Sequence, residues 1–211
     1  MMDVNKNLFP DLYKKMQEIL LHLEVLHMYT TTRHEATISV PEYVEQFVDV
    51  PTFLEACKAC PNYDRVWACP SYDFDVIKYW NRYQIFQLLA VKITFDKELL
   101  SRSYTQQEIQ EILDQVLLPE KKKLSDELLR AEKLNPGSIS LSAGSCHLCK
   151  DGCTKPTGGS CRNPDLMRYS IESLGGNVGL TIEKLLGLKL EWIEEGRLPH
   201  HFVLVCGLLL P

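Results

Sequence analysis

The stretch Phe202-Val203-Leu204-Val205-Cys206-Gly207-Leu208-Leu209-Leu210 is apolar at every position apart from one glycine. A strand with one solvated face alternates apolar and polar side chains, whereas a strand covered on both faces is apolar throughout. The stretch has the length of a strand and is far shorter than the roughly 20 apolar residues of a membrane-spanning helix. It therefore predicts a central strand, and the rest of the chain is expected to build a sheet around it.

Two longer elements are predicted upstream of this strand. Residues 83–95 alternate between apolar and polar side chains, as a strand does. Residues 105–134 predict a helix, because Thr105 and Glu108 form a capping-box pattern and Ile109, Ile112 and Val116 recur on one face. Pro119 is expected to kink or split this helix, and Asn135-Pro136-Gly137 should end it.

Shorter patterns fill the remainder of the chain. Strands are predicted over 28–32, 36–40, 138–142 and 189–192, and helices over 8–26, 41–47, 51–56, 73–81 and 177–186. This order predicts an α+β sandwich with a mostly antiparallel sheet, loosely ferredoxin-like, with a cysteine-rich metal-binding loop. We expect a single domain over residues 1–211, of which 1–35 form an N-terminal helical extension.

Composition narrows the class of protein. Apolar residues make up 45% and charged residues 24% of the chain, as in ordinary globular proteins. The net charge of −5 argues against nucleic acid as a partner, since phosphate binding needs clustered basic residues. The basic run Lys121-Lys122-Lys123 stands beside acidic residues and is expected to be a solvated helix face. No signal peptide or membrane span is evident, so we expect a cytoplasmic protein that binds no membrane.

The cysteines carry the main functional signal. Seven of the eight fall in two groups, and in a reducing cytosol such groups are metal ligands or redox centres more often than disulfides. The second group consists of Cys146, Cys149, Cys153 and Cys161. Short spacings followed by a longer one suit four thiolates around a compact [4Fe-4S] cluster. Zinc is the alternative, although structural zinc sites usually use two separated Cys-x2-Cys pairs and only one is present here.

The first group consists of Cys57, Cys60 and Cys69. Three thiolates leave two possibilities open: an open coordination position, or a fourth ligand from elsewhere in the chain. Cys206 is the spare thiol, but its apolar strand favours a buried inert cysteine. Other polar candidates for the fourth ligand are Asp64, Tyr63 and Tyr72, and Trp67 is expected to shield the site from water.

These two segments resemble the DUF2284 family of predicted metal-binding proteins. The resemblance rests on Cys57-x2-Cys60-x2-Tyr63-x3-Trp67-x-Cys69-Pro70, on Cys146-x2-Cys149-x3-Cys153-x7-Cys161-Arg162-x-Pro164, on Arg168–Gly175 and on the segment Leu198–Leu209. The chain departs from the family where Asp64 replaces the usual glycine after Tyr63, and where Ser71 replaces a second proline after Cys69. The resemblance implies metal binding, with iron–sulfur chemistry in anaerobes, and supplies no reaction.

Three functional hypotheses follow. The first is a redox or electron-transfer protein with one or two [4Fe-4S] clusters and a redox partner protein. The second is an enzyme whose open metal site activates a small substrate or reduces a partner's cofactor. The third is a zinc-stabilised interaction module.

Three further motifs favour a structural interpretation. Gly175-Gly176-Asn177 is expected to be a turn and a helix cap in preference to a phosphate site. His200 and His201 precede a strand, so one should face inward and one outward. Glu191, Glu194 and Glu195 are expected to be solvated.

Overall fold

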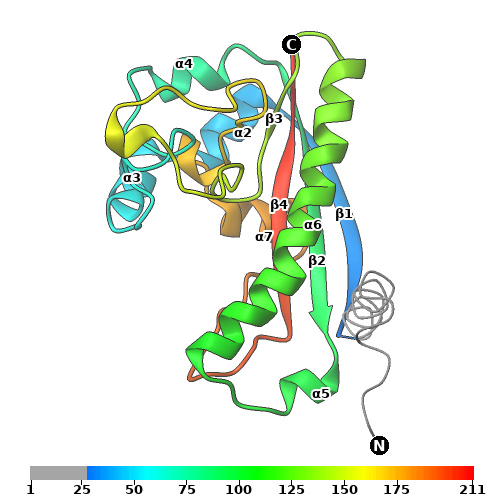
Figure 1. Cartoon of the computed structure of the whole chain (residues 1–211). Helices are drawn as coiled ribbons and strands as arrows, with labels where there is room; N and C mark the ends of the chain where they lie inside the picture. The colour runs from blue at the N-terminus through cyan, green and yellow to red at the C-terminus, as the bar shows by residue number, and fades with distance from the viewer. Residues whose placement is uncertain (1–27) are drawn as a thin grey trace, which may run out of the picture.

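The computed structural model describes residues 28–211, and Figure 1 labels their helices and strands. The strands are β1 (Tyr29–Ser39), β2 (Ile85–Phe95), β3 (Ile139–Leu141) and β4 (His201–Leu210). The α-helices are α2 (Val40–Phe47), α3 (Val50–Lys58), α4 (Val76–Trp80), α5 (Lys97–Leu100), α6 (Gln106–Leu134) and α7 (Val178–Leu186). Two 3-10 turns follow β3, η1 (Lys155–Thr157) and η2 (Glu172–Leu174).

The four strands form one sheet in the order β1-β2-β4-β3, and all neighbours are antiparallel. Strands β2 and β3 both run against β4, so they are parallel to each other and are joined through α6, with β4 between them. This is the split βαβ arrangement of ferredoxin-like folds. The α+β class, the antiparallel sheet and the central position of β4 are thereby confirmed.

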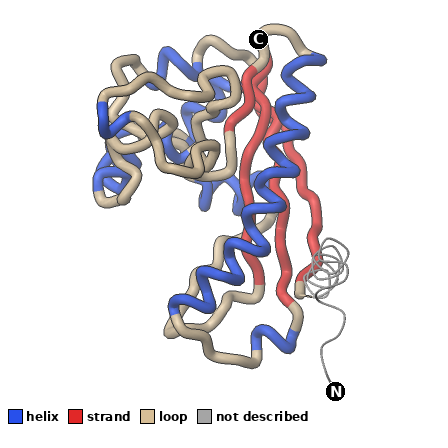
Figure 2. The backbone as a smooth tube through the Cα atoms, in the orientation of Figure 1, coloured by secondary structure: helices blue, strands red, loops and turns tan. Residues whose placement is uncertain are grey.

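Helices cover both faces of the sheet, as Figures 1 and 2 show. Side chains alternate along β2, so Phe86 and Leu88 join one apolar cluster while Leu89 and Val91 join another. The first cluster also contains buried residues of α2 and α7, and the second contains those of α6. None of the described helices is both long and apolar enough to cross a membrane.

Helix α6 follows its predicted signals except at Pro119. Its capping box is complete: Glu108 N donates to Thr105 Oγ1 at 3.3 Å, and Thr105 N donates to Glu108 Oε2 at 2.8 Å. The helix continues through Pro119 over 29 residues and is not split. Val116 on one side of the proline and Leu124 on the other are both buried in the same cluster. Packing against the sheet therefore holds the two halves together despite the lost hydrogen bond.

Two strand predictions are corrected. Residues 28–32 and 36–40 belong to one strand, because β1 pairs with β2 from Tyr29 opposite Phe95 to Ser39 opposite Ile85. Residues 29–35 are thus strand and not part of a helical extension, whereas the predicted helix 8–26 lies outside the described residues. Residues 189–192 form no strand; the Lys189 carbonyl bonds to the His201 ring at 2.9 Å.

The cysteine segments lie to one side of the sheet. We call residues 57–71 and 145–168 the cysteine lobe. In Figure 1 the lobe stands to the left of β4, near α3 and α4, while α6 crosses in front of the sheet. Residues 145–168 leave the sheet shortly after the edge strand β3, as the sequence predicted, so a rigid element fixes one end of that segment.

Candidate metal centre

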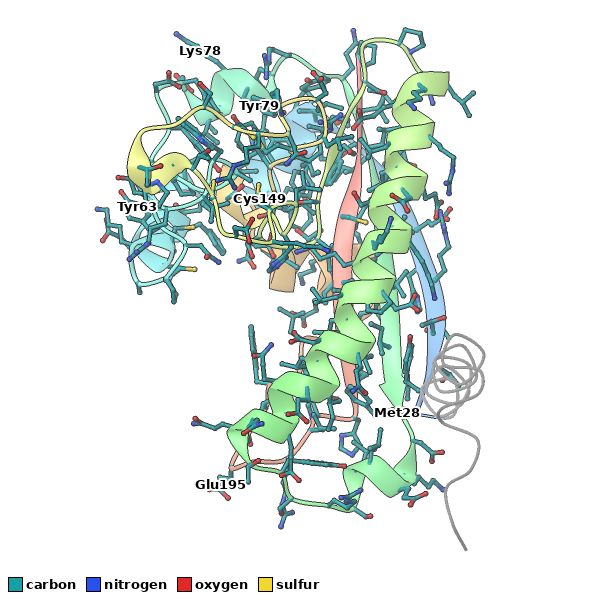
Figure 3. All side chains as sticks on the ribbon, viewed as in Figure 1. Met28, Tyr63, Lys78, Tyr79, Cys149 and Glu195 are labelled. Atoms are coloured by element: carbon teal, nitrogen blue, oxygen red, sulfur yellow. The ribbon has the colours of Figure 1, made fainter. Side chains whose placement is uncertain are left out.

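The second cysteine group surrounds one cavity. Cys146, Cys149, Cys153 and Cys161 all line a space of about 450 Å³, together with Trp67 and other residues of the first segment. Figure 3 labels Cys149 within the cysteine lobe, remote from Glu195 at the far end of the molecule. The lining includes the basic side chains Arg65 and Lys150 and no carboxylate. The cavity thus presents four soft sulfur donors.

The thiols of this group lie close enough to influence one another. Burial raises the pKa of Cys146, and the neighbouring thiols Cys149, Cys161 and Cys153 add to that rise. Asn163 Nδ2 donates to Cys149 Sγ at 3.5 Å. Such N–H donors stabilise a thiolate or a cluster sulfur.

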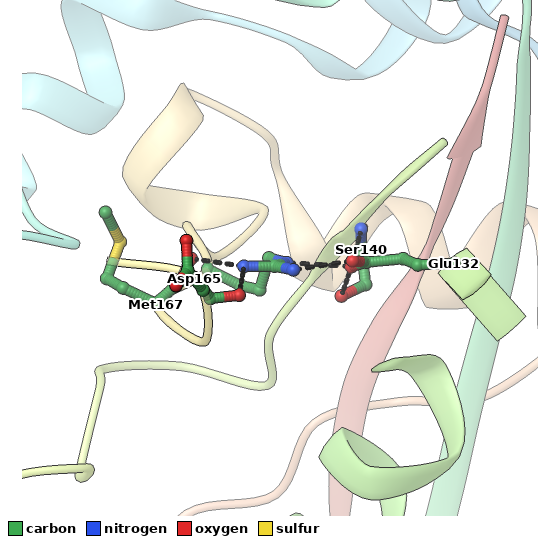
Figure 4. Close-up of polar contacts among 5 residues, drawn as sticks. Glu132, Ser140, Asp165 and Met167 are labelled. Carbon is green, nitrogen blue, oxygen red and sulfur yellow. Dashed lines mark hydrogen bonds and ion pairs between the residues drawn. The ribbon is translucent and has the colours of Figure 1, made fainter. Parts of the chain in front are cut away.

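An ion pair fixes the far end of the second segment. The Arg168 guanidinium donates to both carboxylate oxygens of Glu132, at 2.7 Å to Oε1 and 2.5 Å to Oε2. Glu132 also accepts from Ser140 N at 2.7 Å, so one carboxylate joins α6, β3 and the residues that follow Cys161 (Figure 4). Arg162 donates to the Gly152 carbonyl at 3.0 Å. These two arginines hold the segment's backbone in place.

The first cysteine group also lies within the cysteine lobe. Cys57 is at the end of α3, and Cys60 and Cys69 follow in the lobe. Burial raises the pKa of Cys69 to about 11, with Cys60 and Cys57 as the next causes. Burial and Cys60 likewise raise the pKa of Cys57. Of the three cysteines, Cys60 is exposed, whereas Cys57 and Cys69 are partly buried.

Two side chains fasten the cysteine segments to each other. Lys155, from the second segment, donates to the Cys69 and Ser71 carbonyls at 3.1 Å each and pairs with Asp64 at 3.3 Å. Trp67, from the first segment, donates through Nε1 to Thr154 Oγ1 at 3.3 Å and to the Gly159 carbonyl at 3.1 Å. The two groups therefore sit in one interlocked lobe.

Asp64 adopts a left-handed backbone conformation. Its φ is 53°, in the left-handed region that glycine adopts readily and that aspartate tolerates. Its carboxylate accepts from Ser71 at 3.2 Å and pairs with Lys155. The loop shape is thus compatible with aspartate, because polar partners surround the side chain.

Lys121 is only partly exposed and is bonded beside the second group, which corrects the expectation of a solvated face for this residue. Its ammonium donates to the Ser145 carbonyl, next to Cys146. Burial lowers the pKa of Lys121, and Cys146, Glu172 and Cys69 oppose that change. Lys122 and Lys123 do face solvent and pair with Asp126 and Glu120. A helix turns about 100° per residue, so adjacent lysines point in different directions.

Three of the sequence candidates for a fourth ligand of the first group, Cys206, Asp64 and Tyr72, are otherwise engaged. Cys206 is fully buried in the α6 cluster, where burial raises its pKa to about 12. Asp64 is bonded to Lys155 and Ser71, and the Tyr72 hydroxyl donates to the Ala68 carbonyl at 2.8 Å. His147 lines the cavity of the second group, and burial followed by Lys121 lowers its pKa.

Glu172, at the start of η2, has a position that sequence reasoning did not identify. It falls within the family-like run Arg168–Gly175, which gave it no role. Its carboxyl lies close enough to the Cys57 thiol to raise the pKa of that thiol. Its Oε2 is shielded from solvent and has no hydrogen-bond partner within residues 28–211.

The remaining motifs lie apart from the thiols or are structural. His201 is buried and contacts Glu191 at 3.2 Å, whereas His200 is exposed, so one histidine faces inward as predicted. Gly175 has φ 78° and packs tightly against Val50. Asn177 caps α7 through Oδ1, which accepts from Leu180 N at 2.9 Å. The turn and cap predicted for this segment are confirmed.

The described part of the chain contains no complete ligand set for a single metal ion. Within residues 28–211, no three His, Cys, Asp or Glu side chains converge tightly enough to hold one metal ion. A tetrahedral zinc with Zn–S bonds of about 2.3 Å needs sulfurs about 3.8 Å apart.

Comparison with known proteins identifies the family. The family described as predicted metal-binding protein (DUF2284) matches residues 44–210, a range that contains all seven grouped cysteines. No curated protein and no solved structure gives a significant match. The matched range covers most of the chain and the whole cysteine lobe, and the chain therefore belongs to the DUF2284 family of predicted metal-binding proteins.

Proposed function

We propose that this chain is an iron–sulfur protein that holds a [4Fe-4S] cluster on Cys146, Cys149, Cys153 and Cys161. The observation that carries the proposal is that all four thiols line one cavity of about 450 Å³. Thiolates are the usual ligands of such clusters. The absence of any carboxylate from the lining of this cavity suits a cluster that needs soft donors.

The spacing of the thiols supports a cluster in preference to zinc. Each thiolate of a cubane binds a different iron, so its sulfurs stand farther apart than the ligands of one ion. Four thiols that line one common cavity, with short sequence spacings followed by a longer one, are consistent with that arrangement. A zinc-stabilised interaction module remains the alternative, and metal analysis distinguishes the two.

The chain's own residues orient the ligands and limit water. Trp67 lies over the cavity and is fixed by its two hydrogen bonds to the second segment. The Glu132–Arg168 pair anchors the end of that segment, and Asn163 donates to a ligand sulfur. A bound cluster would supply one-electron transfer, whose potential depends on nearby charge and hydrogen bonds.

We further propose a second centre on Cys57, Cys60 and Cys69. Its support is that Cys60 and Cys57 add to the rise that burial causes in the pKa of Cys69, and that Cys60 adds to the corresponding rise for Cys57. Exposed Cys60 gives this centre a route to a redox partner protein in the cytoplasm. An open position at this centre would also allow an enzyme that activates a small substrate.

Metal analysis of anaerobically purified protein tests the proposal. We expect about four irons and four sulfides per chain for each cluster. The protein should also show a broad absorbance band at about 400 nm. Cys149→Ser should lose the iron of the second group and keep that of the first. Colourless protein that contains zinc and no sulfide contradicts the proposal.

Cys206→Ala is the matched control for this experiment. It removes a cysteine that is buried away from both groups, so the iron content should be unchanged. The same variant should lower the free energy of unfolding by about 1 kcal/mol, because it deletes a buried sulfur from the core. Loss of iron on this substitution would show that the assignment of the ligands is wrong.

A further inference from the structure

Residues 154–160, which we call the bridging loop, connect two of the proposed cluster ligands, Cys153 and Cys161. The loop is closed by its own hydrogen bonds, because Thr154 Oγ1 donates to the Ser160 carbonyl at 2.7 Å. Its two ends are therefore bonded to each other. A cluster bound by the flanking cysteines would fix both ends of this loop, and with them the position of the side chains that it carries.

Lys155, in the bridging loop, has its hydrogen-bond donors engaged by the first cysteine segment. Its ammonium donates to the Cys69 and Ser71 carbonyls at 3.1 Å each and pairs with Asp64 Oδ1 at 3.3 Å. An ammonium group has three N–H donors, so these three acceptors satisfy it. The side chain is only 11% exposed, and Nζ lies 5.7 Å from the centre of the Trp67 ring, within the range of a cation–π contact.

The backbone around Pro70 depends on this lysine. The Cys69 and Ser71 carbonyls stand on either side of Pro70, and no donor to them other than Lys155 lies in the described part of the chain. The Pro70 carbonyl itself accepts from Asp64 N at 2.6 Å. Lys155 thus holds a turn that ends at a cysteine of the first group, although the lysine belongs to the other segment.

We infer that Lys155 is a positioning residue through which cluster binding at the second cysteine group orders the first cysteine segment. The inference rests on the proposed function, since it requires a cluster on the second group, and it requires no metal on the first. The cluster fixes the bridging loop, the loop places Lys155, and Lys155 holds the backbone at Cys69. Trp67, which donates to Thr154 and to the Gly159 carbonyl, gives the two segments a second point of contact.

This coupling gives the two cysteine groups an order of assembly. A segment that is already ordered loses less conformational entropy when it binds a ligand. The first group would therefore be prepared for its own metal or partner once the second group is filled.

The test uses a chain in which the first group has no thiols, with Cys57→Ser, Cys60→Ser and Cys69→Ser combined. Reconstituted anaerobically with ferrous iron and sulfide, this chain should hold about four irons. Hydrogen exchange measured by mass spectrometry then reports on the peptide 64–71. It should exchange at least about tenfold more slowly with the cluster than after chelation, because hydrogen bonds from a charged group oppose local opening.

Three substitutions in that chain locate the coupling. Lys155→Met should keep the four irons and abolish the difference in exchange between the cluster-bound and the chelated form. Asp64→Asn removes the charge that pairs with Lys155, and asparagine tolerates the left-handed backbone, so the difference should fall at least about twofold. Lys58→Met is the matched control: its ammonium bonds to Glu55 at 2.7 Å within α3, so the difference should be unchanged.

The outcomes separate the cluster from the coupling. Absence of iron from the chain without first-group thiols overturns the second-group cluster, and the inference with it. Bound iron with equal exchange of peptide 64–71 before and after chelation leaves the cluster standing and overturns the coupling. A difference that persists in Lys155→Met, or that disappears equally in Lys58→Met, overturns the role of Lys155. If Lys155→Met fails to retain iron, Asp64→Asn decides, and an undiminished difference there overturns the same role.

Discussion

Lys121 is the residue whose role changed most between sequence and structure. The ammonium of the partly buried Lys121 donates to the Ser145 carbonyl, which places a positive charge beside the second cysteine group. Thiolates and reduced clusters are negatively charged, and burial strengthens the attraction between such charges. Lys121 therefore belongs to the electrostatics of the site, although it is remote from both groups in sequence.

Substitution of Lys121 should change the reduction potential of the cluster proposed for the second group. Lys121→Met removes a positive charge that favours the more negative, reduced form, so the potential should become more negative. Potentiometric titration followed by visible absorbance measures the change, and Lys121→Arg should retain most of the wild-type potential. Lys122→Met, at an exposed position paired with Asp126, is the matched control and should leave the potential unchanged. An equal shift in both methionine variants would contradict a local role for Lys121.

At the scale of single elements, α6 begins at a well-defined cap. Thr105→Ala removes the hydroxyl that accepts from Glu108 N, and half of the capping box with it. Loss of an N-cap costs about 1 kcal/mol of stability. Urea unfolding of the metal-free protein should show this decrease, whereas Gln106→Ala at the next, exposed position should change stability by less than about 0.5 kcal/mol. If Thr105→Ala left the free energy of unfolding unchanged, the cap would make no net contribution to the stability of the fold.

The contact between α6 and the cysteine lobe depends on Glu132 and Arg168. Both side chains are largely buried, with exposed fractions of 12% and 13%. Replacing one partner leaves an unpaired charge, so Glu132→Gln should cost about 3 kcal/mol at pH 7. Glu127→Gln, which breaks an exposed pair with Arg33, should cost less than about 1 kcal/mol.

The cost of Glu132→Gln should depend on pH in a defined direction. Burial opposes ionisation of Glu132, but hydrogen bonds from Arg168 and Ser140 outweigh it, so its pKa lies below the ordinary value. A carboxylate with a lowered folded pKa stabilises the protein fully above the unfolded pKa, about 4.3. That contribution is lost as pH falls through the folded pKa. The difference between wild type and variant should therefore shrink when metal-free protein is unfolded at pH 3.

At the scale of the whole molecule, the sheet and the cysteine lobe differ in what stabilises them. The sheet is held by long antiparallel pairings and two apolar clusters. The cysteine segments are mostly irregular, and their cysteines are only partly buried or exposed. A structural metal usually orders such a segment, because its binding energy becomes folding energy.

Removal of the proposed metal should consequently loosen the lobe and leave the sheet unchanged. In hydrogen exchange measured by mass spectrometry, peptides from residues 57–71 and 145–168 should exchange faster after chelation. Peptides from β2 and β4 should remain as protected from hydrogen exchange as before chelation. Equal exchange in the lobe with and without metal would contradict a structural role for the metal.

The sequence alone determined those features that depend on local pattern. The alternation of β2, the unbroken apolar run of β4 and the capping box of α6 report directly on burial and on hydrogen bonding within a few residues. Cysteine spacing likewise delimits the two groups, because a ligand set wraps its metal with short loops.

Only the tertiary structure decided which distant residues meet at the site. Pairing with β2 merged two predicted strands into β1, and packing carried α6 through Pro119. The fold brought Lys121 from a helix to the Ser145 carbonyl beside Cys146, and it buried Cys206 in the α6 cluster. A local sequence pattern reflects how each residue contacts its neighbours in sequence. Contacts between residues that are distant in sequence depend instead on how the elements pack in space.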